Sequence, residues 1–331
     1  MDNLTPALIV VLLLVLAAEF VNGLTDAPNA IATVVSTRVL SPFKAVIMAA
    51  GLNILGALIT GTAVASTIGK GIVKPEAIDL SVVAAAMITI VLWSAIAWRY
   101  GIPTSESHEL VAGLAGAGLA AAGPSVLLGG GWQKVLIGLG FSTFLGFILS
   151  FGLMTGLYWL LRRASTSSVR NIFGRLQIVS AGFMAFSHGS NDGQKFMGAF
   201  ALALVLGGAM SEFTIPVWVM LLLGAVMGLG TAFGGWRIIR TMGFKITKLE
   251  PVHGFAAESS GALAILLASR FGIPLSTTHT IGTSIMGVGA TRRFSAVRWG
   301  MAREIITTWI ITFPACALLG YVFTLLLRFV F

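Results

Sequence analysis

The sequence predicts an all-α polytopic membrane protein built from two homologous halves, with broken or re-entrant helices at the bilayer midplane. Hydrophobic residues make up 56 % of the 331 residues and charged residues only 10 %, whereas soluble domains carry about 25 % charged residues. Long apolar stretches recur along the chain, and two polar motifs each occur twice. The composition therefore excludes a soluble domain, and the duplicated polar motifs indicate a transporter.

A helix needs about 20 apolar residues to cross the hydrocarbon core, and eight stretches approach that length. They are Leu4–Leu16, Ala45–Ala65, Val82–Trp98, Val135–Leu161, Ile178–Leu206, Ile215–Phe233, Phe255–Ala268 and Ile305–Phe331. Two further segments, Leu110–Ala122 and Thr280–Ala290, are short and rich in glycine, as in broken or re-entrant helices. We therefore expect eight to twelve membrane segments. No basic segment precedes the first stretch, so we expect no cleaved signal peptide there.

The net charge of +9 does not indicate nucleic-acid binding, because the basic residues lie in short loops between apolar stretches. They form three clusters: Arg162, Arg163, Arg170 and Arg175; Arg237, Arg240, Lys245 and Lys248; and Arg292, Arg293 and Arg298. Positively charged loops mark the cytoplasmic side of a membrane protein. Two spans separate the first two clusters, and the loop between those spans holds Glu212 without Lys or Arg. Both clusters are therefore expected to face the cytoplasm.

The two repeated motifs have nearly the same offset. R-Y-G-I-P-T-S-E-S-H at Arg99–His108 returns as R-F-G-I-P-L-S-T-T-H at Arg270–His279, 171 residues later (270 − 99). F-V-N-G-L-T-D-A-P-N at Phe20–Asn29 returns as F-S-H-G-S-N-D-G-Q-K at Phe186–Lys195, 166 residues later (186 − 20). Sites made of paired broken helices usually come from inverted repeats. We predict an N-terminal repeat over 1–161, a basic cytoplasmic linker loop over 162–175 and an inverted C-terminal repeat over 176–331.

The G-I-P motifs predict an anion site. Pro103 and Pro274 suit the first turn of a helix, and a helix N-terminus offers free N–H groups and the positive end of the helix dipole. Two such helix starts facing each other would surround a tetrahedral oxyanion. The predicted ligands are Thr104, Ser105, Ser107, Ser276, Thr277 and Thr278. Alternatively, these hydroxyls cap the helices or bond the backbone of a kinked helix.

The aspartate motifs predict a cation site. Asp26 and Asp192 are aligned by the repeat, and a carboxylate at the bilayer centre costs about 3 kcal/mol, so each requires a cation, a proton or a partner. Side-chain oxygens nearby suit Na⁺, with carbonyl groups of unwound backbone completing the shell. The predicted Na⁺ ligands are Asn22, Asp26, Asn29, Asn191, Asp192, Glu109 and Glu258. Lys195 either neutralises an aspartate or binds the anion directly.

Three further titratable residues lie in the G-I-P motifs. His108 and His279 each end a motif, and Glu106 lies within the first. Histidine carries protons near neutral pH, but a neutral histidine that bonds a backbone carbonyl is an equally good interpretation. We therefore regard these three residues as proton-binding or structural and do not predict a proton relay.

Two long segments resemble the paired signatures of the inorganic phosphate transporter (PiT) family. They are N-G-L-T-D-A-P-N-A-I-A-T-V-V-S-T-R (Asn22–Arg38) and H-G-S-N-D-G-Q-K-F-M-G (His188–Gly198). The G-I-P-x-S-x-x-H pair resembles that family's other duplicated element, and the likeness covers the whole chain, closest to the prokaryotic branch. Thr25 replaces the asparagine of the familiar G-x-N-D form in the first copy, whereas Asn191 keeps it in the second.

The resemblance implies an inverted-repeat transporter of the cell membrane that moves phosphate with a cation gradient. It also implies a homodimer, for which the residues themselves give no indication. It assigns the ions to Asp26, Asn29, Asn191 and Asp192. It assigns phosphate to the hydroxyls of Ser105, Ser107, Ser276, Thr277 and Thr278. We predict Na⁺ symport by alternating access, without enzymatic activity or a bound cofactor. Proton coupling, or another tetrahedral oxyanion such as sulfate, is the alternative. An intramembrane phosphatase would need one asymmetric catalytic set, and a passive channel would not need buried carboxylates.

Overall fold

The computed structural model describes residues 5–329, which form helices and no β-strand. The first half contains α1 (Pro6–Ser36), α2 (Pro42–Ile59), α3 (Ala63–Gly71), α4 (Leu80–Tyr100), α5 (Glu106–Ala122) and α6 (Gly129–Leu160). The second half contains α7 (Thr166–Leu206), α8 (Val217–Phe233), α9 (Trp236–Arg240), α10 (Pro251–Arg270), α11 (Thr277–Arg292) and α12 (Trp299–Leu327). Both halves therefore have the same order of elements. Leu4 and Phe331, at the ends of two predicted apolar stretches, lie outside the described residues.

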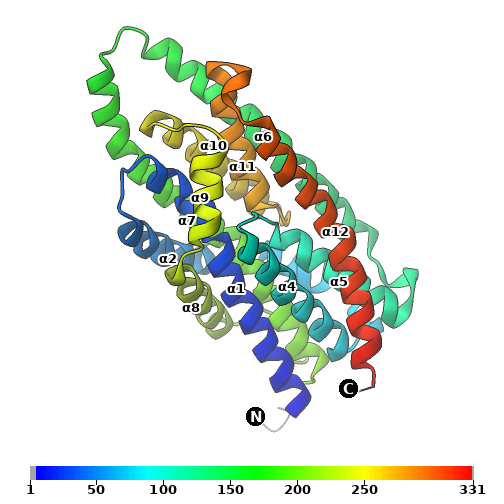
Figure 1. Ribbon diagram of the computed structural model, residues 1–331. Helices are drawn as coiled ribbons and strands as arrows, with labels where there is room; N and C mark the ends of the chain where they lie inside the picture. The colour runs from blue at the N-terminus through cyan, green and yellow to red at the C-terminus, as the bar shows by residue number, and fades with distance from the viewer. Residues whose placement is uncertain (1–4, 330–331) are drawn as a thin grey trace.

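The two halves are inverted relative to each other, as the sequence predicts. In Figure 1, α1 runs from the N-terminus toward the far end of the molecule, whereas its counterpart α7 begins at that far end and runs back. The helices α6 and α12 also run in opposite directions. The two chain termini consequently lie at one end of the molecule, and the α6–α7 connection lies at the other (Figure 1).

Each half packs its last long helix against the other half. The helix α6 packs along α11, and α12 packs along α5. Equivalent glycines allow these close approaches: a Cβ atom on Gly116 would come within 1.8 Å of the Ala317 carbonyl oxygen, and one on Gly287 within 2.5 Å of the Phe147 carbonyl oxygen. The two halves therefore form a single packed unit.

Six of the described helices are long and apolar enough to cross a membrane, and the bent pair of α8 with the segment Trp236–Lys245 would make a seventh. This number is lower than the eight to twelve predicted segments. The helix α7 is long enough at 41 residues, but a polar motif interrupts its apolar character. The short helices α3, α5 and α11 cannot cross alone. Counting α7 brings the total only to the lower end of the prediction.

The connection between the halves is shorter than the predicted loop over 162–175. The helix α6 ends at Leu160, and α7 begins at Thr166. Ser165 caps α7, because its Oγ accepts a hydrogen bond from the Ser168 backbone N–H at 3.2 Å. No glycine or proline that would break the helix occurs until Gly174. Arg170 and Arg175 therefore lie on α7 rather than in a loop.

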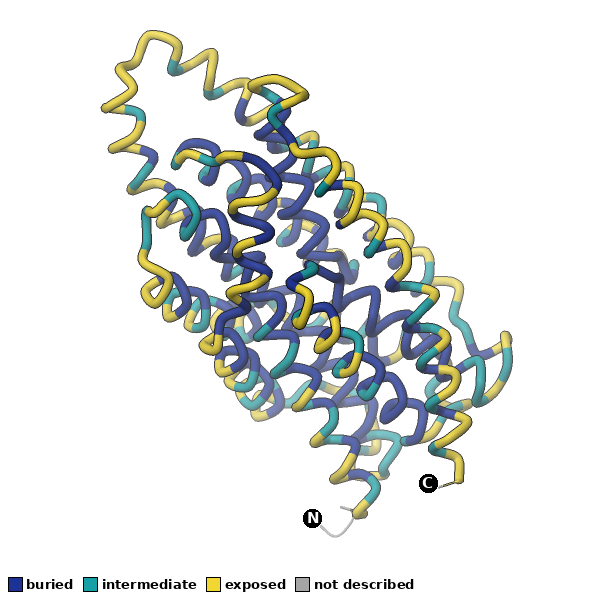
Figure 2. The backbone as a smooth tube through the Cα atoms, in the orientation of Figure 1, coloured by how far each residue is buried: buried dark blue, intermediate teal, exposed yellow. Residues whose placement is uncertain are grey.

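Burial separates the inner helices from an exposed outer surface (Figure 2). The helix α5 is buried from Glu106 to Gly118, and α11 from Thr277 to Ala290. The outward faces of α6 and α12 carry exposed side chains such as Phe144 and Ile310. Exposed large apolar side chains on long helices fit a lipid environment. The polar motifs are thus enclosed by helices that face the membrane.

Candidate functional site

Two breaks between helices bring the G-I-P motifs to the centre of the protein. Gly101 ends α4 with a φ of 67°, and Gly272 follows α10 with a φ of 65°. Glycine adopts this left-handed conformation without a Cβ clash, so it ends helices readily. The prediction that Pro103 and Pro274 lie in the first turn of a helix is wrong. Both lie in the non-helical segments that precede α5 and α11. The helices begin only after Ser105 and Ser276.

Ser105 and Ser276 are the N-caps of α5 and α11. The Ser105 Oγ accepts a hydrogen bond from the His108 backbone N–H at 3.4 Å, and the Ser276 Oγ accepts one from the His279 backbone N–H at 3.2 Å. In this structure the hydroxyls of Ser105 and Ser276 therefore cap helices, which was the alternative to anion binding. It also fixes the starts of both helices inside the membrane-embedded part of the chain.

The aspartate motifs lie within continuous helices, so they do not themselves supply the unwound backbone expected to complete the cation shell. Asp26 lies in the middle of α1 and Asp192 in the middle of α7. Pro28 removes one helical hydrogen bond, yet α1 continues to Ser36. The breaks occur at the G-I-P motifs instead. The aspartates must therefore obtain their partners from side chains and from the broken helices.

The two aspartates meet at the start of α11. The Thr277 Oγ1 lies 2.9 Å from Asp192 Oδ2 and 3.5 Å from Asp26 Oδ2. The Thr278 Oγ1 donates to Asp26 Oδ1 at 3.1 Å. The Asn29 amide donates to the hydroxyls of Thr277 and Thr278 at 3.3 Å and 3.0 Å. One broken helix thus joins the polar motifs of both repeats.

Lys195 forms an ion pair with Asp192 and is only 1 % exposed. Its ammonium group also donates to the Ser107 Oγ at 2.5 Å and to the Leu275 carbonyl oxygen at 3.0 Å. Three partners use the three N–H donors of a lysine. In this structure Lys195 is therefore the counter-ion of Asp192, and it reaches the start of α5 at the same time.

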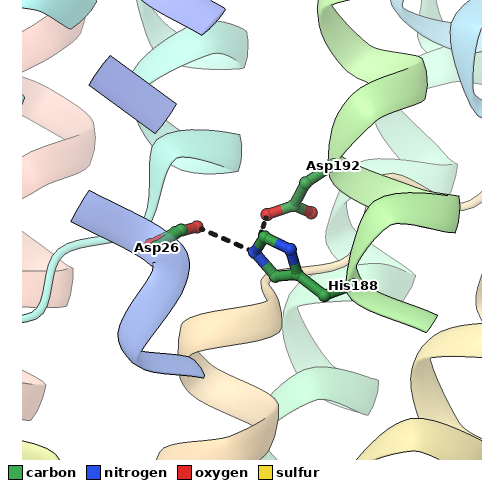
Figure 3. Close-up of side chains that lie close together, drawn as sticks. All are labelled: Asp26, His188 and Asp192. Atoms are coloured by element: carbon green, nitrogen blue, oxygen red, sulfur yellow. Dashed lines mark ion pairs between the residues drawn. The ribbon is translucent and has the colours of Figure 1, made fainter. Parts of the chain in front are cut away.

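The structure adds His188 to the cluster, a residue that the duplicated motifs alone do not single out. Its Nε2 lies 3.4 Å from Asp192 Oδ2 and 4.0 Å from Asp26 Oδ2 (Figure 3). Its Nδ1 is 3.2 Å from Asn53 Oδ1. Potential ligand atoms of these two carboxylates and the imidazole lie within 4.8 Å of one another. The four-residue spacing from Asp192, which puts both side chains on one face of α7, is the available sequence signal.

Several buried oxygen atoms have no hydrogen-bond donor among residues 5–329, which suits a cation. They include the Oδ1 atoms of Asn22, Asn29 and Asn191 and the Oε2 atom of Glu106. The other Glu106 oxygen accepts a hydrogen bond from Thr25. Buried polar atoms are normally satisfied, and amide and carboxylate oxygens are hard ligands. These donor-free oxygens are therefore of the kind that Na⁺ prefers.

The remaining predicted ligands make their hydrogen bonds away from the two aspartates. Asn22 donates to Glu19 at 2.8 Å, and Asn191 donates to Ser269 at 2.9 Å. Glu109 accepts from Ser94 at 2.5 Å. Glu258 accepts hydrogen bonds from three polar side chains, Thr33, Gln177 and Ser180. Glu109 and Glu258 thus form polar groups separate from the two aspartates.

His108 and His279 pack together where α5 and α11 begin. Their ring centroids are 4.5 Å apart, and His279 stacks on Trp309 at 3.7 Å. Neither ring nitrogen of His279 has a hydrogen-bond partner within the described chain, so the predicted carbonyl bond is not made by this residue. The Nδ1 of His108 likewise has no hydrogen-bond partner among the described residues. The pair is in contact with aromatic rings rather than with the aspartates.

The charges of the central cluster do not balance. Asp26, Asp192 and Glu106 contribute three carboxyl groups, whereas Lys195 is the only lysine or arginine side chain that contacts them among the described residues. All four side chains are buried. Buried unpaired charge is strongly unfavourable, so the cluster requires further cations or protons.

Inverted halves, facing broken helices and a buried ionisable cluster define a secondary transporter of the helical membrane class. The sequence model of the phosphate transporter family matches residues 22–171 and 161–320. The chain therefore belongs to the phosphate transporter family.

Relatives across bacteria agree with this assignment. The chain is 46 % identical over 316 residues to a protein of Rhizobium meliloti (strain 1021), covering 95 % of each. It is 41 % identical over 334 residues to one of Bacillus subtilis (strain 168), covering 100 % of each. Both are named "Probable low-affinity inorganic phosphate transporter". The relatives are named as transporters, not as enzymes. The apolar spans make this chain a multi-pass membrane protein.

A solved structure has the same fold. It is described as "The sodium-dependent phosphate transporter" and superposes with a TM-score of 0.89 and 26 % sequence identity. The match covers 99 % of this chain and 100 % of the other.

Proposed function

We propose that this protein imports inorganic phosphate together with Na⁺ by alternating access of the central cluster. The observation that carries the proposal is the meeting of Asp26 and Asp192 at the hydroxyls of Thr277 and Thr278. A carboxylate pair, which attracts cations, is thereby placed at a helix N-terminus, which attracts anions. The names of the relatives and of the similar solved structure support phosphate and sodium as the two cargoes.

In this mechanism phosphate lies between the starts of α5 and α11. Hydroxyl donors from both helix starts and the Lys195 ammonium group bind its oxygens; the residues are Thr104, Ser105, Ser107, Ser276, Thr277 and Thr278. The contact of Lys195 with Ser107 supports this placement, because it puts a positive charge at the α5 start. Lys195 would then exchange its bond to Asp192 for one to phosphate, so the two interpretations of this lysine describe different steps.

Sodium ions lie at the aspartates. Asp26, Asn29, Asn191 and Asp192 provide oxygen ligands, and the donor-free oxygens of the two asparagines support this assignment. Asn22, Glu109 and Glu258 are further candidate Na⁺ ligands, since each has buried side-chain oxygens. Carboxylate and amide oxygens are preferred by hard cations.

Coupling follows from the charge imbalance. Phosphate cannot enter a buried site that already holds excess carboxylate unless cations bind first or together with it. Each net positive charge that moves inward down 100 mV supplies about 2.3 kcal/mol. At about 1.4 kcal/mol for a factor of ten, that charge supports roughly 1.6 decades of phosphate gradient. The halves 1–161 and 176–331, joined at the predicted cytoplasmic side, would move relative to each other; a homodimer remains a prediction.

Labelled phosphate uptake into proteoliposomes tests the proposal. An inward Na⁺ gradient at fixed pH should drive accumulation above equilibrium, whereas K⁺ in place of Na⁺ should not. Accumulation driven equally by a pH gradient without Na⁺ would replace sodium coupling with proton coupling. Competition by sulfate as strong as that by unlabelled phosphate would reject phosphate selectivity. No accumulation under any gradient would overturn the symport mechanism.

A further inference from the structure

A cavity of about 810 Å³ lies at the end of the molecule where α6 connects to α7. Its lining includes members of all three basic clusters of the sequence together with Arg38; the basic side chains are Arg38, Arg162, Arg170, Lys248 and Arg292. Glu250 is the only carboxylate among the lining residues. Five basic groups and one acidic group leave a formal charge of +4 (5 − 1). Hydroxyl groups of Thr37, Tyr158 and Thr166 also line the cavity.

Among the described residues, most of these basic groups form no ion pair. Arg292 pairs with Glu250 at 2.6 Å, but Arg38, Arg170 and Lys248 form no ion pair with any described residue. Arg162 lies over the Trp159 ring at 5.1 Å. A concave surface lined by one sign of charge concentrates the field and attracts oppositely charged ligands. The cavity therefore suits an anion.

Arg38 enters the cavity lining where α1 ends. Its φ of 61° is the single positive value for a residue other than glycine among residues 5–329. The backbone N–H groups of Arg38 and Val39 donate to the carbonyl oxygens of Val35 and Val34, which is the pattern that ends a helix on a left-handed residue. The end of α1 therefore places Arg38 in the cavity lining.

We propose that this cavity is a binding site for a soluble or lipid-borne molecule with two or more phosphate groups, on the predicted cytoplasmic side. Cavities of about 300–1,000 Å³ hold organic ligands of drug size, so the volume exceeds what one inorganic phosphate needs. The formal charge of +4 matches a nucleoside di- or triphosphate or a lipid with more than one phosphate better than a singly charged ion. Hydroxyls and arginines provide the donors that phosphate oxygens accept.

A ligand bound in the cavity would slow transport. This part of the inference rests on the proposed function. The lining comes from both halves: Arg38 and Tyr158 belong to the first, and Lys248 and Arg292 to the second. A bound polyanion would bridge the halves and resist their relative movement. The cavity residue Thr37 lies eleven residues beyond Asp26 on the path of α1 (37 − 26), about 16 Å at 1.5 Å per residue.

Hydrogen bonds connect the cavity toward the central site. Thr37 donates to the Gln177 side chain at 2.8 Å, and Gln177 donates to Glu258 at 3.0 Å. Thr33 donates to the same Glu258 oxygen at 2.5 Å. A ligand that displaces Thr37 would therefore disturb a buried polar group one to two helical turns from Asn29. A phosphate compound bound in this cavity would therefore inhibit transport when such compounds are abundant inside the cell.

Direct binding tests the site without requiring transport. Labelled ATP without Mg²⁺ is titrated onto the protein in nanodiscs of phosphatidylcholine. We expect saturable binding that weakens at least tenfold in the double variant Arg170→Gln/Lys248→Gln. The matched control Arg163→Gln/Arg293→Gln removes the same charge from neighbouring positions outside the lining and should stay within twofold of wild type. Absence of saturable binding, or equal weakening in both variants, would overturn the proposal.

A second set of nanodiscs, containing phosphatidylglycerol and cardiolipin, identifies the source of the ligand. Unchanged ATP affinity would assign the site to a soluble phosphate compound. Competitive loss of ATP affinity that also depends on Arg170 and Lys248 would assign it to lipid headgroups.

Uptake measurements then test the regulatory part. ATP on both sides of the vesicle membrane should slow Na⁺-driven uptake severalfold in wild type and in the control variant, but not in Arg170→Gln/Lys248→Gln. Without ATP, all three proteins should transport at the same rate. Binding without inhibition would reject the regulatory role. Failure of wild type to transport under any gradient would instead contradict the proposed function and leave the binding result standing.

Discussion

Asn29 and Lys195 occupy equivalent positions in the two repeats (195 − 29 = 166), and each contacts the broken helix of the other half. Asn29 donates to Thr278 of α11 at 3.0 Å, and Lys195 donates to Ser107 of α5 at 2.5 Å. Ser107 and Thr278 are themselves equivalent (278 − 107 = 171). The site is thus built by reciprocal contacts, but only one copy contains a fixed cation. The first aspartate consequently depends more on a cation from solution.

Asp26→Asn should reduce Na⁺-driven phosphate uptake at least tenfold, because it removes a carboxylate with which no lysine or arginine among the described residues forms an ion pair. Asp192→Asn should do the same by removing the partner of Lys195. Initial uptake rates at several Na⁺ concentrations provide the measurement. Glu212→Gln, an exposed carboxylate in a loop, is the control. Normal sodium dependence in Asp26→Asn would reject its role in cation binding.

Lys195→Met should destabilise the protein by about 3–5 kcal/mol, because it leaves the Asp192 charge buried without its partner. The double variant Lys195→Met/Asp192→Asn should recover most of that loss and still fail to transport. Thermal unfolding in detergent measures the first effect and uptake the second. A single variant as stable as the double variant would show that the ion pair does not form.

His108→Gln and His279→Gln should retain uptake driven by Na⁺. Both rings pack against aromatic neighbours, and His279 has no hydrogen-bond partner within the described residues. The measurement compares uptake driven by Na⁺ alone with uptake driven by a pH gradient alone. Loss of the sodium-driven component in both variants would place protons on these histidines.

Gly116→Ala should destabilise the packing of α5 against α12 by about 1–3 kcal/mol. The added Cβ would lie within 1.8 Å of the Ala317 backbone oxygen, which cannot move aside as a flexible side chain does. Gly140→Ala is the matched control, since a Cβ there meets nothing within 4 Å. Thermal midpoints of the two variants should differ clearly, and equal midpoints would contradict the tight contact between the halves.

Glu250 provides a pH test at the cavity. Burial alone would raise the pKa of this carboxyl group, but the hydrogen bond and charge of Arg292 outweigh it and hold the pKa below its ordinary value of 4.5. A lowered pKa stabilises the folded state above the ordinary pKa, and that contribution is lost as the pH falls through the lower folded value. Because the Glu250 side chain is 56 % exposed, the effect is at most about 1 kcal/mol.

The corresponding measurement is the difference in thermal midpoint between wild type and Glu250→Gln. It should be small and constant from pH 7 to about 5 and should shrink below pH 4.5. A difference that grows on acidification would have the wrong sign for this ion pair.

The sequence was sufficient to predict the structural features that arise from the duplicated motifs. Duplicated motifs identify the inverted halves, and their glycine and hydroxyl residues locate the breaks before α5 and α11. The continuity of α1 was not predictable, because Gly23 and Pro28 locally favour a break near Asp26. Packing of α1 against α4, α7 and α8 overrides that preference.

Contacts between distant segments account for the remaining differences. His188 joins Asp26 only because α1 packs on α7, and no spacing within one motif reveals that. Glu109 and Glu258 are polar residues in apolar segments, as the cation sites require, but their positions on α5 and α10 direct them to other hydroxyl partners. Composition identifies buried carboxylates, whereas only the tertiary structure determines which of them meet.

Equilibrium binding of labelled phosphate, in Na⁺ and in K⁺ at equal ionic strength, tests the central claim most directly. If cations on the aspartates admit the anion, Na⁺ should raise phosphate affinity at least tenfold, and phosphate should raise Na⁺ affinity by the same factor. Asp26→Asn should abolish this mutual effect. Equal phosphate affinity in Na⁺ and K⁺ would contradict coupling through the aspartate cluster.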